Sequence, residues 1–558
     1  MSGHDVYQPP VFSTPIDLDL SRNEGRPGPS TRAALANGFG SQVARYPDTS
    51  RLRQALAHRF GVGTDRVLVT AGGDDALFRC FLSRAGGRVV ATNPGFEMIR
   101  RYTSQTGSPL EEVEWWEGDF PTAEMAAAGA EKGDMAVIVS PNNPTGAVAT
   151  ADDLAQVAAV FDLVVLDAAY GEFADEDLTG TALRLDNVVM VRTMSKAFGL
   201  AGLRVGCLVG SAENIERIAA FGNPYPMSAP SAEIAIRALA DQASMEDFVD
   251  RIRRERSELT DFLTAAGAAP LPSQANFVLA RFPNAPRLVA MAASLGVGLR
   301  VFPDRPDLEG MVRLTLPGDA GDFQRLISTL EKALDPEAII FDLDGVLADV
   351  SRSYRAAIIE TAASFGVAVT PEMIREAKAA GRANDDWTLT WRLCRSAGAD
   401  VPLQMVKERF EKVYQGDGST PGLKHGETPL LDRDTLAALA GRLPLGVVTG
   451  RPRTDAAEFL DRFDLGEFFS AVVTREDAPM KPDPGPVRLA LARLGVDRAW
   501  MLGDTGDDLV AARAAGVIPI GVVAPGDDPT KAREALSDAA MVLDTTAQIM
   551  EVLDGQDI

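Results

Sequence analysis

A lysine lies among small hydroxyls and cations in the stretch RTMSKAFGLAGLRVG (192–206). Lys196 follows Thr193 and Ser195, and Arg204 comes eight residues later. A lysine amine can form a Schiff base with a carbonyl group, above all that of pyridoxal phosphate. Hydroxyls and an arginine can hold a phosphate. The stretch therefore predicts that one cofactor is bound between Lys196 and Arg204.

The rest of the sequence offers the other groups that this cofactor needs. TAGGDDAL (70–77) follows an apolar run and opens a helix, so the amides of Gly73 and Asp74 can cradle a phosphate. Asp167 ends the run LVVLD, and its carboxylate can hold the protonated ring nitrogen from the C-terminal edge of the sheet.

Three further residues complete the predicted cofactor site. Asn143 in SPNNPTG and Tyr170 in DAAY can donate hydrogen bonds to the ring oxygen. Phe96 in NPGFEM is predicted to cover the ring face, with a role as an ordinary core aromatic as the alternative.

With these motifs in order, residues from about 17 to 334 resemble a fold-type I aminotransferase, above all the histidinol-phosphate aminotransferases. RYPD (45–48) and MVRLTLPG (311–318) extend the match. The resemblance implies that Lys196 moves the substrate proton and that Tyr46 reaches the cofactor phosphate of a neighbouring subunit, as in a homodimer. It also implies that Arg313 grips the anionic end of the substrate, with Arg300 near it.

The sequence departs from that family at two places. Ala168 stands where an acidic residue is usual, and RNEGRPG (22–28) replaces an entry segment that resembles NENP. Both lie near the expected substrate pocket, so they bear on the substrate rather than on the cofactor.

A different set of residues begins with FDLDGVLAD (341–349). Asp342 and Asp344 are two residues apart, so in an extended chain their side chains project to the same side. One carboxylate can attack a phosphoryl group while the other protonates the leaving oxygen. Because these groups and the phosphate repel one another, we expect a Mg²⁺ ion between them, with Asp342 and Asp344 as ligands.

Later segments supply the rest of that site. Asp504 and Asp508 in GDTGDD are predicted to complete the metal shell. Thr449, at the end of LGVVT, and Lys481 in MKPDPGP can hold the transferring phosphoryl group.

These elements, over residues 337–558, resemble the phosphatase branch of the haloacid dehalogenase superfamily. Residues from about 350 to 432 are then expected to form a helical cap. A polar cluster in this segment is predicted either to meet the substrate or to form a turn between cap helices. Its members are Arg382, Asn384, Asp385 and Trp387.

The elements that must position all these residues alternate between strands and helices. RVLVT (66–70), RVVAT (88–92), MAVIVS (135–140), LVVLDAAY (163–170) and VVMVRT (188–193) are predicted to be buried parallel strands. Helices are expected over SRLRQALAHRF and SAEIAIRALADQ, among others.

We therefore predict an α/β protein of two parts. The first, residues 1–334, is expected to have the large and small domains of a fold-type I pyridoxal phosphate enzyme. The second, residues 337–558, is expected to be a Rossmann-like haloacid dehalogenase core with its cap. A boundary is predicted at 334–337, with a linker of a few residues that holds the parts in a fixed relation.

Composition limits the partners. The 558 residues have a formal net charge of −24, which argues against non-specific binding to nucleic acid. Apolar runs fall short of the roughly 18 residues of a membrane span. Three separated cysteines indicate reduced thiols in a cytoplasmic protein, and the three histidines show no metal-ligand spacing.

The sequence thus predicts a bifunctional enzyme acting on small molecules, a transaminase followed by a Mg²⁺-dependent phosphatase. The two steps match the conversion of imidazole-acetol phosphate through histidinol phosphate in histidine biosynthesis. Three alternatives are an enzyme of a specialised pathway acting on another keto or amino phosphate, an aromatic aminotransferase with a regulatory phosphatase-like domain, and a decarboxylase.

Overall fold

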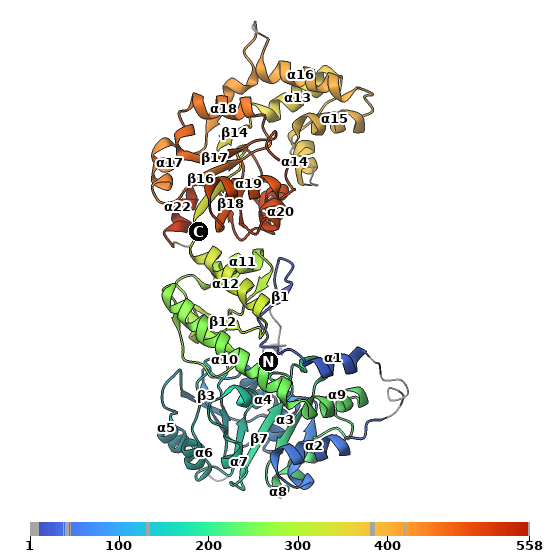
Figure 1. Ribbon diagram of the computed structural model, residues 1–558, viewed down its shortest axis with the longest axis vertical. Helices are drawn as coiled ribbons and strands as arrows, with labels where there is room; N and C mark the ends of the chain where they lie inside the picture. Colours follow the sequence, from blue (N-terminus) through green and yellow to red (C-terminus); the bar gives the residue numbers. More distant parts are fainter. Residues whose placement is uncertain are drawn as a thin grey trace. The chain divides into compact units, whose positions relative to one another are not determined.

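The computed structural model describes residues 11–36, 38, 44, 46–129, 134–379, 385–417 and 419–555 (Figure 1). By contacts between residues, the chain divides into two compact units. The N-terminal unit comprises Asp19–Ala285 and Leu299–Arg325, and the C-terminal unit comprises Met1–Leu18, Pro286–Gly298 and Leu326–Ile558. None of the described helices is both long enough and apolar enough to cross a membrane.

A seven-stranded sheet forms the centre of the N-terminal unit. In spatial order its strands are β2 (Val67–Thr70), β8 (Gly206–Val209), β7 (Val188–Thr193), β6 (Leu163–Asp167), β5 (Met135–Val139), β3 (Val89–Asn93) and β4 (Leu110–Glu114). Strands β3 to β7 run parallel, and every residue of β5, β6 and β7 is buried, as the continuous apolar runs predict.

The prediction of a parallel strand at RVLVT is wrong. The strand exists as β2, but it pairs antiparallel with β8. After β7, the Lys196 segment turns the chain back, so that β8 runs antiparallel to β7 and separates it from β2. A sheet edge of this kind depends on a turn far along the chain from β2, which is why the apolar run alone does not reveal the direction.

Helices precede, connect and follow these strands. Their bounds are α1 (Pro29–Ala36), α2 (Ser50–Phe60), α3 (Gly73–Ser83), α4 (Glu97–Thr106), α5 (Thr122–Ala128), α6 (Ala151–Ala158), α7 (Thr179–Ala182), α8 (Ala212–Ala219), α9 (Ala229–Ala240) and α10 (Gln242–Ala265). Helix α2 spans the predicted segment SRLRQALAHRF. Apolar side chains of α3, α4 and α8 pack against the sheet and form its core on that side.

A smaller antiparallel sheet accompanies the large one in the same unit. Its strands, in order, are β12 (Met311–Thr315), β10 (Phe277–Arg281) and β9 (Ala269–Pro270). The remaining elements of this part of the chain are β1 (Leu18–Asp19), α11 (Ala285–Ser294), β11 (Val297–Gly298) and α12 (Ala320–Leu334). The division into units passes through α11 and α12.

The C-terminal unit contains a six-stranded sheet that is parallel throughout. Its strands, in order, are β17 (Phe469–Val473), β16 (Leu445–Val448), β13 (Ala338–Phe341), β18 (Ala499–Gly503), β19 (Ile518–Val522) and β20 (Val542–Leu543). Its helices are α17 (Arg433–Ala440), α18 (Arg453–Arg462), α19 (Gly485–Leu494), α20 (Gly506–Ala514), α21 (Pro529–Ala535) and α22 (Ile549–Leu553). Within this unit the Trp500 indole donates a hydrogen bond to the Lys332 carbonyl at 2.8 Å.

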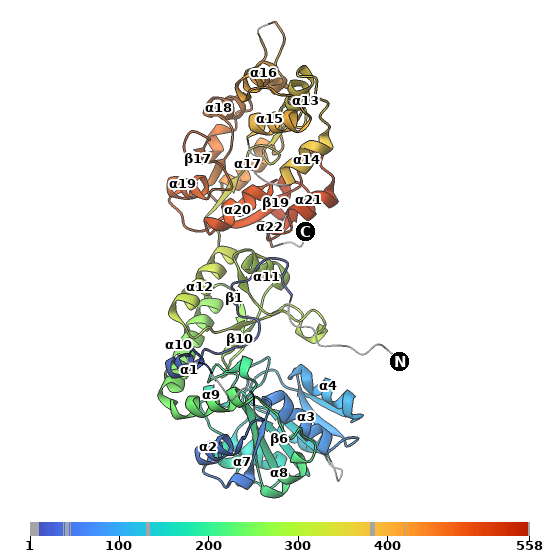
Figure 2. The ribbon, with the colours of Figure 1, turned by 90° about the vertical axis from the view of Figure 1, so that its right-hand side faces the viewer.

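In the described part of the segment predicted as a cap, the α-helices are four. They are α13 (Tyr354–Ser364), α14 (Pro371–Ala379), α15 (Asp386–Ser396) and α16 (Leu403–Gln415). Helices α13, α15 and α16 pack on one another (Figures 1 and 2). The segment leaves and re-enters the core through the antiparallel pair β14 (Ala348–Asp349) and β15 (Thr428–Pro429). Of the polar cluster, Arg382 and Asn384 lie outside the described residues.

Candidate active sites

Lys196 lies in the turn between β7 and β8, under the entry segment of the N-terminal unit. Its Nζ donates a hydrogen bond to the Arg22 carbonyl at 3.3 Å and lies 5.6 Å from the centre of the Tyr170 ring. A Cβ at Gly25 would come within 1.8 Å of the Lys196 carbonyl oxygen. The segment RNEGRPG (22–28), which differs from the usual entry segment of the family, is thus packed directly against Lys196. Its sequence can therefore affect which substrate reaches the lysine amine.

The residues predicted to hold the phosphate are brought together at the start of α3. Gly72 caps this helix with φ 86°, and a Cβ there would lie 2.8 Å from Nη2 of Arg204. A Cβ at Gly73 would lie 3.6 Å from Cβ of Thr193. The Thr193 hydroxyl donates to the Ser195 hydroxyl at 2.9 Å. Helix amides, two hydroxyls and a guanidinium therefore lie close together, and these are the groups that bind an anion.

The predicted phosphate cradle also contains a negative charge. Arg204 Nη2 lies 2.8 Å from the Asp74 carboxylate, and both side chains are about half exposed. A bound phosphate would compete with Asp74 for this guanidinium, while the Asp74 main-chain amide would remain a donor at the helix start.

Asp167 lies at the end of β6 and is 4% exposed. Burial raises the pKa of its carboxyl to about 7, although the hydrogen bond from the Ala169 amide (3.1 Å) acts in the opposite direction. A buried carboxylate without a full positive partner favours a cationic group beside it. A protonated pyridine nitrogen fits this requirement, so the residues present suit pyridoxal phosphate.

Asn23 links several of the predicted residues and was missed by sequence reasoning. Its Nδ2 donates to the Tyr170 hydroxyl at 3.1 Å, and its Oδ1 accepts from the Thr315 hydroxyl at 2.7 Å. It is buried and has φ 53°, a left-handed conformation that asparagine tolerates better than most residues. The available signal was an uncharged polar residue between two charged ones in RNEG.

Arg300 and Arg313 face each other across two extended segments. Their main chains exchange both hydrogen bonds, at 3.2 and 2.9 Å, so their side chains lie on one face. The Arg313 guanidinium donates to Asn143 Oδ1 at 2.6 Å and to the Ser21 carbonyl at 2.9 Å. The Phe302 ring lies within 5.4 Å of one guanidinium and 5.8 Å of the other. Both cations therefore lie against the same aromatic ring.

Two further aromatic residues were predicted to contact the cofactor, Phe96 and Tyr46. Phe96 precedes α4 and packs, partly buried, against the core of the large sheet. Tyr46 is 79% exposed, and its ring stacks on that of Tyr225 with centres 4.3 Å apart. Phe96 thus has the contacts of a core aromatic, and Tyr46 is a surface residue of the single chain.

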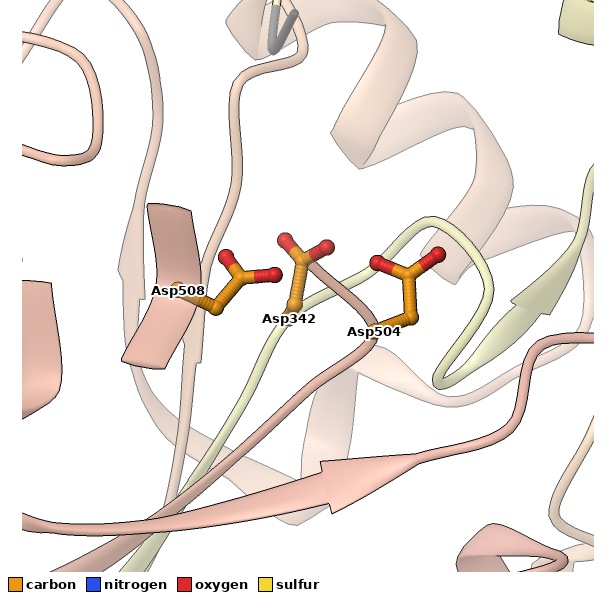
Figure 3. Close-up of side chains that lie close together, drawn as sticks. All are labelled: Asp342, Asp504 and Asp508. Atoms are coloured by element: carbon orange, nitrogen blue, oxygen red, sulfur yellow. The ribbon is translucent and has the colours of Figure 1, made fainter. Parts of the chain in front are cut away.

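The second site collects three carboxylates at one edge of the six-stranded sheet. Asp342 follows β13, Asp504 follows β18, and Asp508 lies in the first turn of α20. One oxygen from each lies within 4.8 Å of the others. Figure 3 shows Asp342 between the other two, with the three carboxylates pointing to the same side. Clustered carboxylate oxygens suit Mg²⁺, so these residues fit the predicted ion.

Lys481 pairs with two of these aspartates. Its Nζ lies 2.7 Å from Asp342 Oδ1 and 2.5 Å from Asp508 Oδ1, and it donates to the Val448 carbonyl at 3.2 Å. Burial by itself would lower the pKa of Lys481, but the two carboxylates outweigh burial and raise it. Burial raises the pKa of Asp342, while the Lys481 ammonium opposes that rise. The lysine is thus a cation held against the predicted nucleophile.

Thr449 and Asp344 are both connected to one further residue, Arg451. The buried Thr449 hydroxyl, at the end of β16, accepts a hydrogen bond from the Arg451 amide at 3.1 Å. Asp344, predicted as acid and metal ligand, presents its carboxylate to the Arg451 guanidinium. Sequence reasoning missed Arg451, although an arginine two residues after the strand-end threonine was visible in TGRPR.

Comparison with known proteins agrees with this geometry. Residues 15–330 match the family model for aminotransferase class I and II, and residues 339–522 match that for haloacid dehalogenase-like hydrolases. The chain is 31% identical over 320 residues to histidinol-phosphate aminotransferase 1 of Trichormus variabilis, covering 56% of this chain and 90% of that protein.

Two other comparisons add to this. An imidazoleglycerol-phosphate dehydratase of Phytophthora nicotianae is 47% identical over 197 residues, which span 34% of this chain but only 44% of that protein. The crystal structure of histidinol-phosphate aminotransferase from Sinorhizobium meliloti with pyridoxal 5'-phosphate superposes with a TM-score of 0.53 at 26% identity, covering 57% of this chain and 91% of that one. The chain therefore belongs to the class I and II aminotransferases, and its aminotransferase domain is followed by a haloacid dehalogenase-like hydrolase domain.

Proposed function

We propose that this enzyme transaminates a phosphorylated ketone of the imidazole-acetol phosphate class and then hydrolyses the phosphate ester of the amino product, histidinol phosphate. The pairing of Arg300 with Arg313 carries the first half of the proposal. This pairing places both arginine side chains on one face, and a phosphate dianion bound there can accept hydrogen bonds from both guanidiniums and offset their positive charges. The names of the similar aminotransferases support the same substrate class.

In the first reaction, bound pyridoxal phosphate would supply an electron sink for the charge that develops at the substrate Cα. Lys196 would move the proton at that atom, since its amine is beside the entry segment. Asp167 would hold the ring nitrogen, and Tyr170, oriented by Asn23, would donate to the ring oxygen. The cradle at the start of α3 would bind the cofactor phosphate.

In the second reaction, Asp342 would attack phosphorus and the bond from phosphorus to the leaving oxygen would break. Asp344 would give its proton to that oxygen, and afterwards take one from the water that releases phosphate from Asp342. Thr449 and Lys481 would hold the phosphoryl oxygens. Mg²⁺, held by Asp342, Asp504 and Asp508, would supply positive charge against the phosphate dianion.

We also propose the domain bounds, the oligomeric state and the cellular location of the enzyme. We assign residues 1–334 to the aminotransferase and 337–558 to the phosphatase, with a cap at about 350–432; α12 ends at Leu334 and β13 begins at Ala338, which supports this boundary. The exposed stack of Tyr46 on Tyr225 supports a homodimer in which a partner covers these rings. Three buried free cysteines support a reducing, cytoplasmic setting.

The test supplies histidinol phosphate and 2-oxoglutarate to purified protein and follows glutamate and phosphate separately. Arg300→Ala should lower kcat/KM for histidinol phosphate about 10- to 100-fold, because one arginine–phosphate contact is lost, and should affect phenylalanine much less. The matched control is Arg281→Ala, which removes an exposed arginine on β10. It should leave kcat/KM unchanged for both substrates.

A different outcome would assign a different substrate. If histidinol phosphate yields neither glutamate nor phosphate while phenylalanine is transaminated well, the phosphorylated substrate is wrong. The aromatic or specialised aminotransferase then takes its place. Lys196→Ala should abolish transamination in either case, so it separates a wrong substrate from a wrong reaction.

A further inference from the structure

Arg451 is the largest fully buried side chain in the described part of the chain, with 2% of its surface exposed. It lies after β16, two residues beyond Thr449, and its head group is turned toward the predicted phosphatase site. A buried charge requires charged or hydrogen-bonding partners, because it has lost its hydration. The partners of Arg451 therefore indicate why it is there.

The principal partner is Asp344. Arg451 donates from Nε at 2.8 Å and from Nη2 at 2.5 Å, and both bonds end on the same oxygen, Oδ1. Two bonds from one planar guanidinium fix the position of Oδ1, and the covalent link of the carboxylate to Cβ then limits where Oδ2 can lie. Because both bonds use Oδ1, this pairing leaves Oδ2 to the leaving group. The Asp344 side chain is 26% exposed, which gives a substrate access to it.

The opposite end of the guanidinium is held mainly by residues near the two ends of the predicted cap segment. Nη1 donates to Glu427 Oε2 at 3.0 Å, and Glu427 also accepts from the Ser353 hydroxyl at 2.7 Å. The rings of Tyr354, at the start of α13, and Phe459, in α18, lie 4.9 and 5.3 Å from the guanidinium carbon. Arg451 is thus fixed by the two segments through which the chain enters and leaves the cap.

We propose that Arg451 is a positioning residue of the phosphatase, which holds Asp344 by Oδ1 so that Oδ2 faces the leaving oxygen. The inference rests on the proposed phosphatase function. In the transfer step Asp342 forms a bond to phosphorus, the phosphorus–oxygen bond of the ester breaks, and the proton on Asp344 Oδ2 passes to the released oxygen. The product is an alcohol, and Arg451 stabilises the carboxylate that remains on Asp344.

The experiment measures kcat/KM for a series of substituted phenyl phosphates that run from good to poor leaving groups. This ratio reports transfer to Asp342, the first irreversible step. A good leaving phenol departs without a proton, whereas a poor one depends on the acid, whose contribution is typically about 10²- to 10⁴-fold. Arg451→Met should therefore lose about tenfold or less with the best leaving group and about 100-fold or more with the poorest.

Four further variants make the result specific. Asp344→Asn should show the same dependence on the leaving group, and adding Arg451→Met to it should cause little additional loss, since both changes remove one function. Arg451→Lys keeps the charge but offers no planar pair of donors, so its loss of kcat/KM with the poorest leaving group should lie between those of wild type and Arg451→Met. This variant also provides the test if Arg451→Met does not fold. Arg453→Met removes an exposed arginine of the same segment and should leave the series unchanged.

Equal losses across the series in Arg451→Met or Arg451→Lys would overturn the inference, because a general structural defect slows all substrates alike. Independent, multiplying losses in the double variant would overturn it as well. If the wild-type enzyme hydrolyses no ester in the series, or if Asp342→Asn is as active as wild type, the proposed phosphatase function fails and the inference fails with it.

Discussion

Gly72→Ala tests whether the space at the start of α3 is the cofactor phosphate site. Gly72 has φ 86° and ψ −179°, a region that is essentially restricted to glycine, so a side chain there costs about 1–3 kcal/mol. The new Cβ would also lie 2.8 Å from Nη2 and 3.1 Å from Cζ of Arg204, so the guanidinium must move. An arginine–phosphate contact is worth about 1.5–3 kcal/mol.

The loss of that contact should raise the Kd for pyridoxal phosphate about 10- to 150-fold. The assay titrates cofactor-free protein with pyridoxal phosphate and follows visible absorbance, with Tm recorded for each variant. Gly107→Ala is the matched control, because Gly107 caps α4 with φ 66° and has open space where the Cβ would lie. It should lower Tm through backbone strain and leave Kd unchanged. Wild-type Kd in Gly72→Ala, or an equal rise in both variants, would refute the assignment.

Two further predictions concern the hydrolase and the stability of the N-terminal unit. Asp342→Asn should reduce the rate of phosphate release below about a thousandth of the wild-type rate. Glutamate formation should continue, because the transaminase residues belong to the other unit. Loss of both activities in a folded variant would contradict this. Burial raises the pKa of Glu255 from 4.5 to about 7, despite the hydrogen bond that its Oε2 accepts from the Gly318 amide at 2.8 Å. Between these pH values the unfolded chain has lost the proton and the folded chain keeps it, so stability falls as pH rises and stays lower above pH 7. The glutamine in Glu255→Gln cannot ionise. The Tm of this variant should therefore match that of wild type near pH 4.5 and exceed it at pH 8, by an amount equivalent to about 3 kcal/mol of unfolding free energy. Equal Tm differences at both pH values would show that the Glu255 carboxyl does not titrate in this way.

The sequence by itself determined the features that depend on local geometry. Residues 338–349, AIIFDLDGVLAD, were enough to predict a strand that delivers Asp342 to a sheet edge, because buried parallel strands are continuous apolar runs and their carboxyl ends meet at one edge. The same reasoning predicted Asp167 at the end of β6 and Lys196 after β7. In each case the residue's position follows from a few neighbours in the chain.

Only the tertiary structure decided which distant residues share those edges. Arg451 meets Asp344 across 107 residues, and Asn23 meets Tyr170 across 147. An arginine in a loop or an asparagine in an entry segment is common, and nothing local distinguishes a buried one from a solvated one. The antiparallel direction of β2 was likewise set by its pairing with β8. Such contacts form only when residues far apart in the chain are brought together, so they depend on the packing of the whole unit. Hydrophobic periodicity indicates only whether a local segment is a helix or a strand and which of its faces is buried.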